Sequence, residues 1–307
     1  MKIHSTLTIA AAAAMLALAS GCASDPLNAG STAGAGTAGS GEKIVVGSAN
    51  FSENVILGEI YAKALEDAGY AVERKLNIGA REVLYGQIEN CSINVVPEYN
   101  QALLAFVAPD TQASGTDAVD AELGKTLPAN LGILTSSPAQ DNNAVAVTNA
   151  TAQRLNLKTM EDLAKASSGM TFGGPTEWKT RADGYAGLEK AYGIAFKEYK
   201  LLDYSGPITI SALDKGDVDA ALLFSTVPQI KANGYTVLED PKNALGVNNV
   251  TPLVCKEAVP EKAQSVLNAV SKSLTTEELT SMNASYAIDH MDAADVASEW
   301  VGKQDLK

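Results

Sequence analysis

Residues 43–69, KIVVGSANFSENVILGEIYAKALEDAG, indicate the fold class of this chain. The first six, KIVVGS, are a run rich in β-branched residues that ends in small ones, which favours a buried strand. Residues 55–68 then carry apolar side chains at helical spacing, and Gly69 is a typical helix stop. A strand, a loop and a helix in this order are typical of the start of an α/β unit.

The same alternation continues along the chain. In the first half we expect a helix over 83–88 and strands over 71–76, 93–96, 131–134 and 144–147. From Thr159 the cycle restarts, with helices over 160–166, 184–192, 208–213 and 227–232 and strands over 170–172, 198–202, 220–224 and 235–238. A strand over 249–255 and helical periodicity over 260–300 follow. The pattern predicts parallel α/β sheets in two units, and the polar turn 136–143 is a place where the chain can cross between lobes.

The N-terminus carries an export signal. Lys2 is followed by an apolar run over residues 9–19 that is too short to span a membrane, which is typical of a signal peptide. We therefore expect residues 1–21 to be removed and the protein to function outside the cytoplasm.

The end of this signal indicates lipidation. Residues 18–22, LASGC, resemble the bacterial lipobox, with Ala19 where leucine is usual. We expect Cys22 to carry a lipid anchor; the alternative is an ordinary secretory signal cut nearby. Residues 22–42, rich in Ala, Gly, Ser and Thr, then form a flexible tether to the membrane.

Composition excludes several classes of protein. A chain of 307 residues can bury a core in each of two modest lobes. Its 46% hydrophobic and 19% charged residues argue against wholesale disorder. The 36 acidic residues outnumber the 23 basic ones, so a net charge of −13 opposes contact with nucleic acid.

The sequence offers little for catalysis. Its only histidines are His4, in the signal peptide, and His290, in the helical tail. Without HExxH, GxSxG or Cys/His ligand spacing, we expect no enzyme, no metal and no cofactor. The many carboxylates leave a paired-acid hydrolase as a formal alternative.

Four segments in order resemble the osmoprotectant-binding proteins of ABC importers, which bind glycine betaine, choline or carnitine. They are GSANFSE at 47–53, PEY at 97–99, GGPTEWKTRADG at 173–184 and VLEDP at 237–241. The resemblance covers residues 43–300 and implies a two-lobed type II periplasmic-binding fold. It implies an extracytoplasmic monomer that receives a small solute between its lobes and delivers it to an ABC permease with its ATPase.

The resemblance also implies lobe boundaries and a disulfide. Lobe I would comprise residues 43–143 and 250–307, and lobe II residues 144–249. By themselves, Cys91 and Cys255 are either a disulfide of an exported protein or two unpaired thiols. The family topology places strand 249–255 antiparallel beside strand 93–96, which would bring the two cysteines together.

A quaternary ammonium group is best held by aromatic faces. Tyr99 matches the tyrosine of the family's Pro-Glu-Tyr motif and follows the third strand, where ligand sites of α/β folds form. Phe224 stands before Ser225-Thr226, where many relatives have a tyrosine, and we count Thr226 with it as a ligand contact. The alternatives are a packing role at the hinge for Tyr99 and in the core for Phe224.

A betaine also has a carboxylate, which a guanidinium or helix N-terminal N–H groups can bind. Arg181 is the leading candidate, with a solvated surface arginine as the alternative. Asn50, Phe51 and Glu53 precede the first long helix and are further candidates, although neighbouring residues are equally plausible as plain helix caps.

The chain departs from its relatives at several of these positions. Gln101 and Asn248 are expected ligand contacts, but Gln101 replaces part of a common Thr-Gly-Thr and Asn248 lies near a position that is aromatic in some relatives. Trp178 and Tyr185 are possible replacements, with core packing as the simpler interpretation. A reduced aromatic box leaves open a different polar solute, and a sensor module for a membrane receptor is a further alternative.

Overall fold

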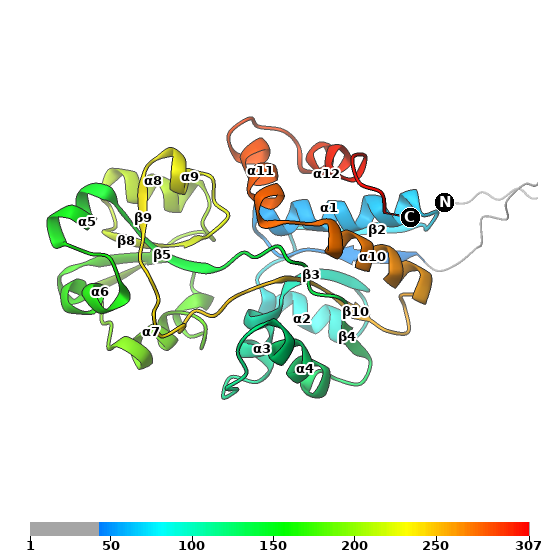
Figure 1. The fold of residues 1–307 in the computed structure, drawn as a ribbon, viewed down its shortest axis with the longest axis horizontal. Helices are drawn as coiled ribbons and strands as arrows, with labels where there is room; N and C mark the ends of the chain where they lie inside the picture. Colours follow the sequence, from blue (N-terminus) through cyan, green and yellow to red (C-terminus); the bar gives the residue numbers. More distant parts are fainter. Residues whose placement is uncertain (1–42, 307) are drawn as a thin grey trace, which may run out of the picture. The chain divides into compact units, whose positions relative to one another are not determined.

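The computed structural model describes residues 43–306, which form two five-stranded sheets flanked by helices (Figure 1). The expected signal peptide, the lipid-attachment residue Cys22 and the tether lie outside the described residues. Both sheets belong to one compact unit of the chain. The predicted α/β class with two lobes is therefore confirmed.

Each sheet is built around strands from distant parts of the sequence. The first sheet has the order β2-β1-β3-β10-β4, with β1 (Ile44–Gly47), β2 (Val72–Lys75), β3 (Val95–Tyr99), β4 (Leu131–Ile133) and β10 (Val250–Cys255). The second has the order β7-β6-β8-β5-β9, with β5 (Asn143–Thr148), β6 (Thr171–Gly174), β7 (Glu198–Leu201), β8 (Ala220–Phe224) and β9 (Tyr235–Val237).

The sheets are mixed, and this corrects the expectation of parallel sheets. β1 is parallel to β2 and β3, and β6 is parallel to β7 and β8. By contrast, β10 runs antiparallel to β3 and β4, and β5 runs antiparallel to β8 and β9. A parallel neighbour needs a long crossover connection, whereas β5 and β10 enter their sheets directly from the segments that link the two sheets. The pairing of β10 with β3 is the one that the family resemblance implied.

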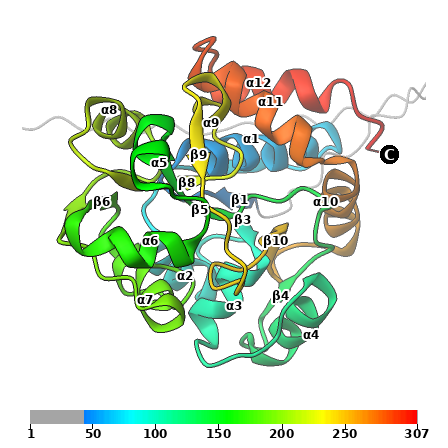
Figure 2. The same ribbon diagram turned by 60° about the vertical axis from the view of Figure 1, so that its left-hand side comes forward.

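The two linking segments lie side by side (Figure 2). Gln140 and Asn249 form an isolated antiparallel bridge. The backbone N–H of Asp141 donates to the carbonyl of Asn248 at 3.0 Å. Residues 134–142 and 238–249 therefore form a paired connection between the sheets.

The helices fill the connections and the C-terminal region. They are α1 (Ser52–Asp67), α2 (Arg81–Glu89), α3 (Asn100–Val107), α4 (Thr116–Thr126), α5 (Asn149–Leu155), α6 (Met160–Ala166), α7 (Tyr185–Tyr192), α8 (Pro207–Lys215), α9 (Gln229–Ala232), α10 (Glu261–Ser273), α11 (Thr276–Ala287) and α12 (Ala293–Val301). Sequence periodicity missed α3, α4 and α5. Helix α3 follows β3 directly, and no turn residue marks its start. Helix α4 buries only Val119 and Leu123, so it has no clear apolar stripe.

Helix α1 fixes the first part of the site. Ile56, Leu57 and Ile60 are fully buried, and each contributes roughly 1.5–3 kcal/mol by leaving water. The helix packs against α10, α11 and α12. At Gly58 a Cβ atom would lie 2.7 Å from Leu76 Cδ2, so α1 approaches the β2 side of the sheet closely. The loop before α1 is thereby held at the edge of the sheet where β3 ends.

A disulfide ties lobe I together. Cys91 and Cys255 are bonded, with their Cα atoms 5.7 Å apart. The bond joins the turn after α2 to the end of β10.

No helix within residues 43–306 is long and apolar enough to cross a bilayer.

Candidate ligand-binding site

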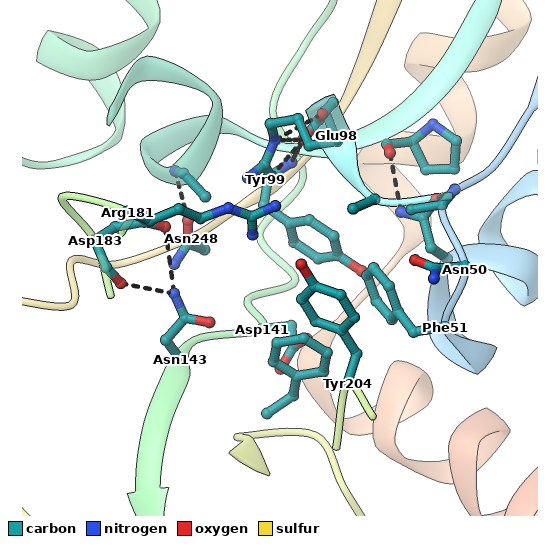
Figure 3. Close-up of a pocket in the computed structure, with 17 residues that line it drawn as sticks. Asn50, Phe51, Glu98, Tyr99, Asp141, Asn143, Arg181, Asp183, Tyr204 and Asn248 are labelled. Atoms are coloured by element: carbon teal, nitrogen blue, oxygen red, sulfur yellow. Dashed lines mark hydrogen bonds and ion pairs between the residues drawn. The ribbon is translucent and has the colours of Figure 1, made fainter. Parts of the chain in front are cut away.

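A cavity of about 50 Å³ lies between the two sheets and is lined by residues from both lobes (Figure 3). The first sheet and its helices contribute residues 49–54, 80–81 and 97–102, and the second contributes 181–183, Tyr204 and Phe224. The linking segments add Asp141 and Asn248, and Asn143 at the start of β5 completes the lining. At roughly 10–15 Å³ for each water-sized group, this volume suits a small solute.

Four aromatic rings form one side of this cavity. The centroid of Phe51 lies 5.0 Å from that of Phe224, 6.0 Å from Tyr99 and 6.2 Å from Tyr204. Tyr204 and Phe224 lie 6.4 Å apart. We name Phe51, Tyr99, Tyr204 and Phe224 the aromatic wall. Two of its rings come from each lobe, and their faces can attract a cation.

Sequence reasoning missed Tyr204. It lies in the loop between β7 and α8, and its hydroxyl donates to Glu177 Oε2 at 3.2 Å. An aromatic residue just past a strand end, before Ser205-Gly206, is a signal that could have identified it. Trp178 is instead buried in the core of the second lobe, with its ring 5.4 Å from that of Phe172, and Tyr185 packs against the same core.

Two arginines also line the cavity. Arg181 pairs with Glu82 through two hydrogen bonds of 3.0 Å, so the ion pair joins the two lobes. The Arg181 guanidinium lies 5.8 Å from the centroid of the Tyr204 ring. The predicted site residue thus reaches the cavity, although a carboxylate of this chain already occupies one edge of its guanidinium.

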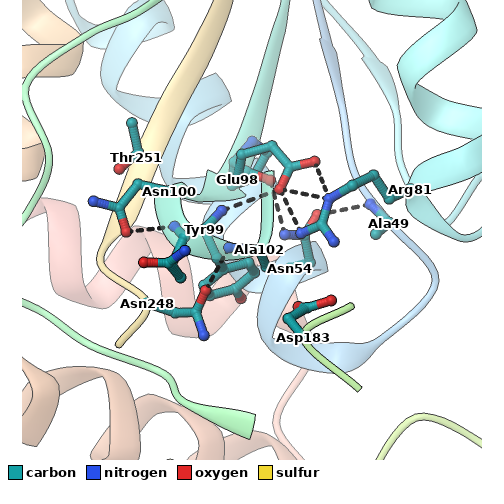
Figure 4. A network of polar contacts seen from close by, with 12 residues as sticks. Ala49, Asn54, Arg81, Glu98, Tyr99, Asn100, Ala102, Asp183, Asn248 and Thr251 are labelled. Carbon is teal, nitrogen blue, oxygen red and sulfur yellow. Dashed lines mark hydrogen bonds and ion pairs between the residues drawn. The ribbon is translucent and has the colours of Figure 1, made fainter. Parts of the chain in front are cut away.

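The second arginine, Arg81, was not predicted. It is only 9% exposed, and its Nε and Nη2 donate to Glu98 at 2.8–3.1 Å (Figure 4). Burial acts to lower the pKa of Arg81, but the attraction and hydrogen bonds of Glu98 outweigh it, so the pKa is raised and the guanidinium stays charged. Within residues 43–306, neither Arg81 Nη1 nor Arg181 Nη1 has a hydrogen-bond partner.

Asp183 adds a buried carboxyl group beside the arginines. Asp183 is 5% exposed. Asn143 Nδ2 donates to the Asp183 Oδ2 at 3.3 Å and to the Asp183 backbone oxygen at 3.1 Å. Burial raises the pKa of Asp183, while the charges of Arg81 and Arg181 act against this rise.

Glu53 lies behind the aromatic wall and does not line the cavity. It accepts hydrogen bonds from the Tyr99 hydroxyl at 2.6 Å, Thr226 Oγ1 at 2.5 Å and Asn283 Nδ2 at 2.6 Å. Glu53 and Thr226 were expected at the ligand, but the structure uses them to fix the ring of Tyr99 and to connect the lobes. Tyr99 itself lines the cavity, as expected.

Asp141 belongs to the same buried group. Its Oδ1 accepts from the backbone N–H of Thr226 at 3.2 Å and from Ser225 Oγ at 3.3 Å. Burial raises the pKa of Asp141 well above its usual value, and the nearby carboxyl group of Glu53 raises it further.

Of the remaining predicted ligand contacts, two line the cavity and one does not. Asn50 and Asn248 line the cavity, and Asn248 Oδ1 accepts from the backbone N–H of Ala102 at 2.8 Å (Figure 4). Gln101 points away from it and lines a second cavity. No group of three or more potential metal ligands occurs in the described part of the chain.

Comparisons with known proteins agree with this geometry. A sequence model described as the substrate binding domain of ABC-type glycine betaine transport systems matches residues 42–303. The glycine betaine-binding protein YehZ of Escherichia coli is 28% identical over 84% of this chain and 89% of its own. A glycine-betaine-binding protein of Pseudomonas aeruginosa is 25% identical over 86% of this chain and 89% of its own.

Solved structures show the same fold. Apo YehZ from Escherichia coli matches with a TM-score of 0.59 and 26% identity, over 87% of this chain and all of that chain (100%). A structure described as a glycine betaine/carnitine/choline ABC transporter has a TM-score of 0.66 at 22% identity, over 85% of this chain and 98% of its own. The expected type II periplasmic-binding fold is confirmed.

Proposed function

This chain belongs to the family of substrate-binding domains of ABC-type glycine betaine transport systems, and on that basis we propose that it captures glycine betaine or a related quaternary ammonium osmolyte. Members of this family bind a solute for an ABC permease and its ATPase, and they are not enzymes. The observation that carries the proposed ligand is that four aromatic rings and two arginines line one small cavity.

Each end of a betaine finds a suitable partner there. The methylated ammonium has no N–H donor and gains by lying against the faces of the aromatic wall, at about 0.5–2 kcal/mol for each ring. The carboxylate can accept from Arg81 Nη1 and Arg181 Nη1, because Glu98 and Glu82 occupy the other edges of these guanidinium groups.

The charge balance of the cavity disfavours a free anion. Arg81 and Arg181 are each paired with a glutamate, so the two ion pairs add no net charge to the cavity. The other carboxyl groups that line the cavity belong to Asp141 and Asp183, and burial raises the pKa of both. A free anion would therefore enter without a compensating charge.

We infer that the lobes move apart to admit the ligand and close around it, because residues of both lobes line the cavity. We assign lobe I to residues 43–143 with 250–307 and lobe II to 144–249. In support, the buried cores of the two sheets divide at these positions. The paired linking segments are the natural place for bending.

Isothermal titration with glycine betaine, choline, carnitine, ectoine, ergothioneine and amino acids tests the proposed ligand. Ergothioneine is included because a Helicobacter pylori permease and binding protein named for it is 24% identical over 78% of this chain and 44% of its own. We expect glycine betaine or another quaternary ammonium to bind, and Phe224→Ala to weaken it about three- to thirtyfold. Tyr286→Ala, at an exposed ring on α11, is the matched control. Binding of amino acids alone would refute the proposed ligand and leave the family unchanged.

The lipid anchor is a separate proposal that rests on the sequence around Cys22. In a bacterial host, the wild-type protein should fractionate with membranes and incorporate labelled fatty acid, and Cys22→Ser should release it in soluble form. Equal soluble fractions for both would exclude the anchor.

A further inference from the structure

Two buried carboxyl groups, those of Glu53 and Asp141, meet on a single residue, Thr226. Glu53 Oε2 accepts from Thr226 Oγ1 at 2.5 Å, and Asp141 Oδ1 accepts from the backbone N–H of Thr226 at 3.2 Å. Glu53, Asp141 and Thr226 are 3%, 4% and 1% exposed. Both carboxyl groups are therefore buried against the same loop, which follows strand β8.

The contacts around Thr226 join different parts of the protein. With the lobes as assigned above, Glu53 belongs to lobe I, Thr226 to lobe II and Asp141 to a linking segment. Asn283 on α11 adds a further contact from lobe I, because its Nδ2 donates to Glu53 Oε2 at 2.6 Å and to the Thr226 carbonyl at 3.4 Å. Separation of the lobes would break these contacts and admit water to both carboxyl groups.

Every hydrogen-bond donor to the two carboxyl groups is neutral. Besides Thr226 and Asn283, the Tyr99 hydroxyl donates to Glu53 and Ser225 Oγ donates to Asp141. Within residues 43–306, no lysine, arginine or histidine forms a hydrogen bond or ion pair with either carboxyl group. Burial and mutual repulsion therefore both act against a second negative charge in this pair.

The geometry places the proton of such a pair on Asp141. Glu53 accepts from three side chains at 2.5–2.6 Å, whereas Asp141 accepts from two groups at 3.2 and 3.3 Å. Short hydrogen bonds favour an ionised carboxylate, so the charge is better placed on Glu53. In agreement, burial and then the charge of Glu53 raise the pKa of Asp141 well above its usual value.

The other titratable groups near the pair line the cavity with Asp141. They are Tyr99 and Glu98 on β3, Arg81 on α2, and Arg181, Asp183 and Tyr204 from lobe II. Burial raises the pKa of Tyr99 well above its usual value, so its hydroxyl stays neutral. The two guanidinium groups are paired with glutamates, as described above, and Asp183 is the one further buried carboxyl group in this lining.

We propose that closure of the lobes over a ligand takes up one proton, which Asp141 holds while Glu53 keeps its charge. This rests on the proposed function, in which the lobes close around the captured solute. In the open form water reaches both carboxyl groups and they ionise independently. The Glu53–Asp141 pair thereby couples solute capture to the pH outside the cytoplasm.

The sign of the pH dependence follows from the two forms. In the open form Asp141 has its usual pKa of about 3.8, and in the closed form this pKa is raised. Between the two values the closed form holds one more proton, so closure and ligand affinity are favoured at low pH. The affinity should fall by up to about tenfold per pH unit through this window and level off above it.

Titration calorimetry with glycine betaine measures the proton directly. When the titration is repeated in two buffers of different ionisation enthalpy, the difference in heat gives the number of protons taken up per ligand bound. We expect the wild-type protein to take up about one proton at pH 6 and to bind at least tenfold more tightly at pH 5 than at pH 8. Asp141→Asn keeps a neutral side chain at every pH, so it should take up little and change affinity less than threefold over this range.

A matched variant separates Asp141 from the other buried carboxyl group. Asp183→Asn removes that group and should keep the proton uptake, whatever its effect on affinity. Loss of the uptake in Asp183→Asn and not in Asp141→Asn would overturn the proposal. Proton release by the wild-type protein would overturn it as well, because the ammonium of the ligand would then ionise Asp141 rather than closure protonating it.

A measurement without ligand keeps this proposal distinct from the proposed ligand. Small-angle X-ray scattering of the ligand-free wild-type protein should give a smaller radius of gyration at pH 5 than at pH 8, whereas Asp141→Asn should give the same value at both. If glycine betaine binds without proton uptake, the proton link is refuted alone. If no quaternary ammonium binds, the proposed ligand is refuted and scattering decides the proton link: equal radii of the wild-type protein at both pH values would refute it too.

Discussion

Replacing Glu53 by alanine should destabilise the protein more than any surface substitution on the same helix. Glu53 is 3% exposed and accepts from three side chains at 2.5–2.6 Å: Tyr99 in lobe I, Thr226 in lobe II and Asn283 on α11. Glu53→Ala removes the acceptor and leaves three buried donors behind.

The magnitude follows from those donors. A buried donor left without a partner costs about 1–3 kcal/mol, and hydroxyl groups recover part of this by rotating. We expect Glu53→Ala to lower the free energy of unfolding by about 3–6 kcal/mol. The matched control is Glu66→Ala, also on α1, whose exposed ion pair with Arg74 is worth at most about 1 kcal/mol.

Urea denaturation followed by circular dichroism measures both variants. The midpoint should fall for Glu53→Ala with little change in the denaturant slope, which reports the surface exposed on unfolding. If Glu53→Ala and Glu66→Ala differ by less than 1 kcal/mol, the buried hydrogen bonds of Glu53 do not hold the lobes together, and the reasoning fails.

Two more predictions concern the titration of Asp141 and the Cys91–Cys255 disulfide. Burial and the charge of Glu53 raise the pKa of Asp141 above its usual value of about 3.8. The protonated Asp141 side chain therefore stabilises the folded protein at acid pH, and this contribution is lost as the pH rises through the raised pKa. The free energy of unfolding of the wild type relative to Asp141→Asn should therefore fall with pH, by up to about 1.4 kcal/mol per pH unit; a constant difference from pH 4 to 9 would contradict this. For the disulfide, Cys91 and Cys255 are 164 residues apart, and Cys255→Ser should cost about 2–5 kcal/mol in non-reducing denaturation; equal stability of wild type and variant, with free thiols in both, would show that the bond does not form in solution.

Most elements could be predicted from the sequence, because side-chain periodicity follows directly from backbone geometry. Helix α6 (Met160–Ala166) and strand β8 (Ala220–Phe224) have the predicted bounds. The predictions failed where a pattern was absent or ambiguous. Helix α3 is apolar on most sides, and strand direction in β5 and β10 depends on how the chain crosses between sheets, which alternation does not report.

The candidate site was predictable only in part. Tyr99, Phe224 and Arg181 were expected at the ligand and do line the cavity. Arg81 was missed because it does not stand out in its local sequence, and Tyr204 was missed although it follows the end of a strand. Both reach the cavity through the packing of the lobes.

The sequence by itself determined the types of most elements and the family motifs, because these depend on residues that are close along the chain; the export signal remains an expectation from the sequence. Only the tertiary structure decided which side chains line the cavity and which contact each other. Arg181 meets Glu82 across 99 residues and Glu53 meets Thr226 across 173, and contacts at such separations arise only when the two lobes pack. Glu53 therefore supports the aromatic wall from behind, although its position at the start of the first long helix suggested a ligand contact.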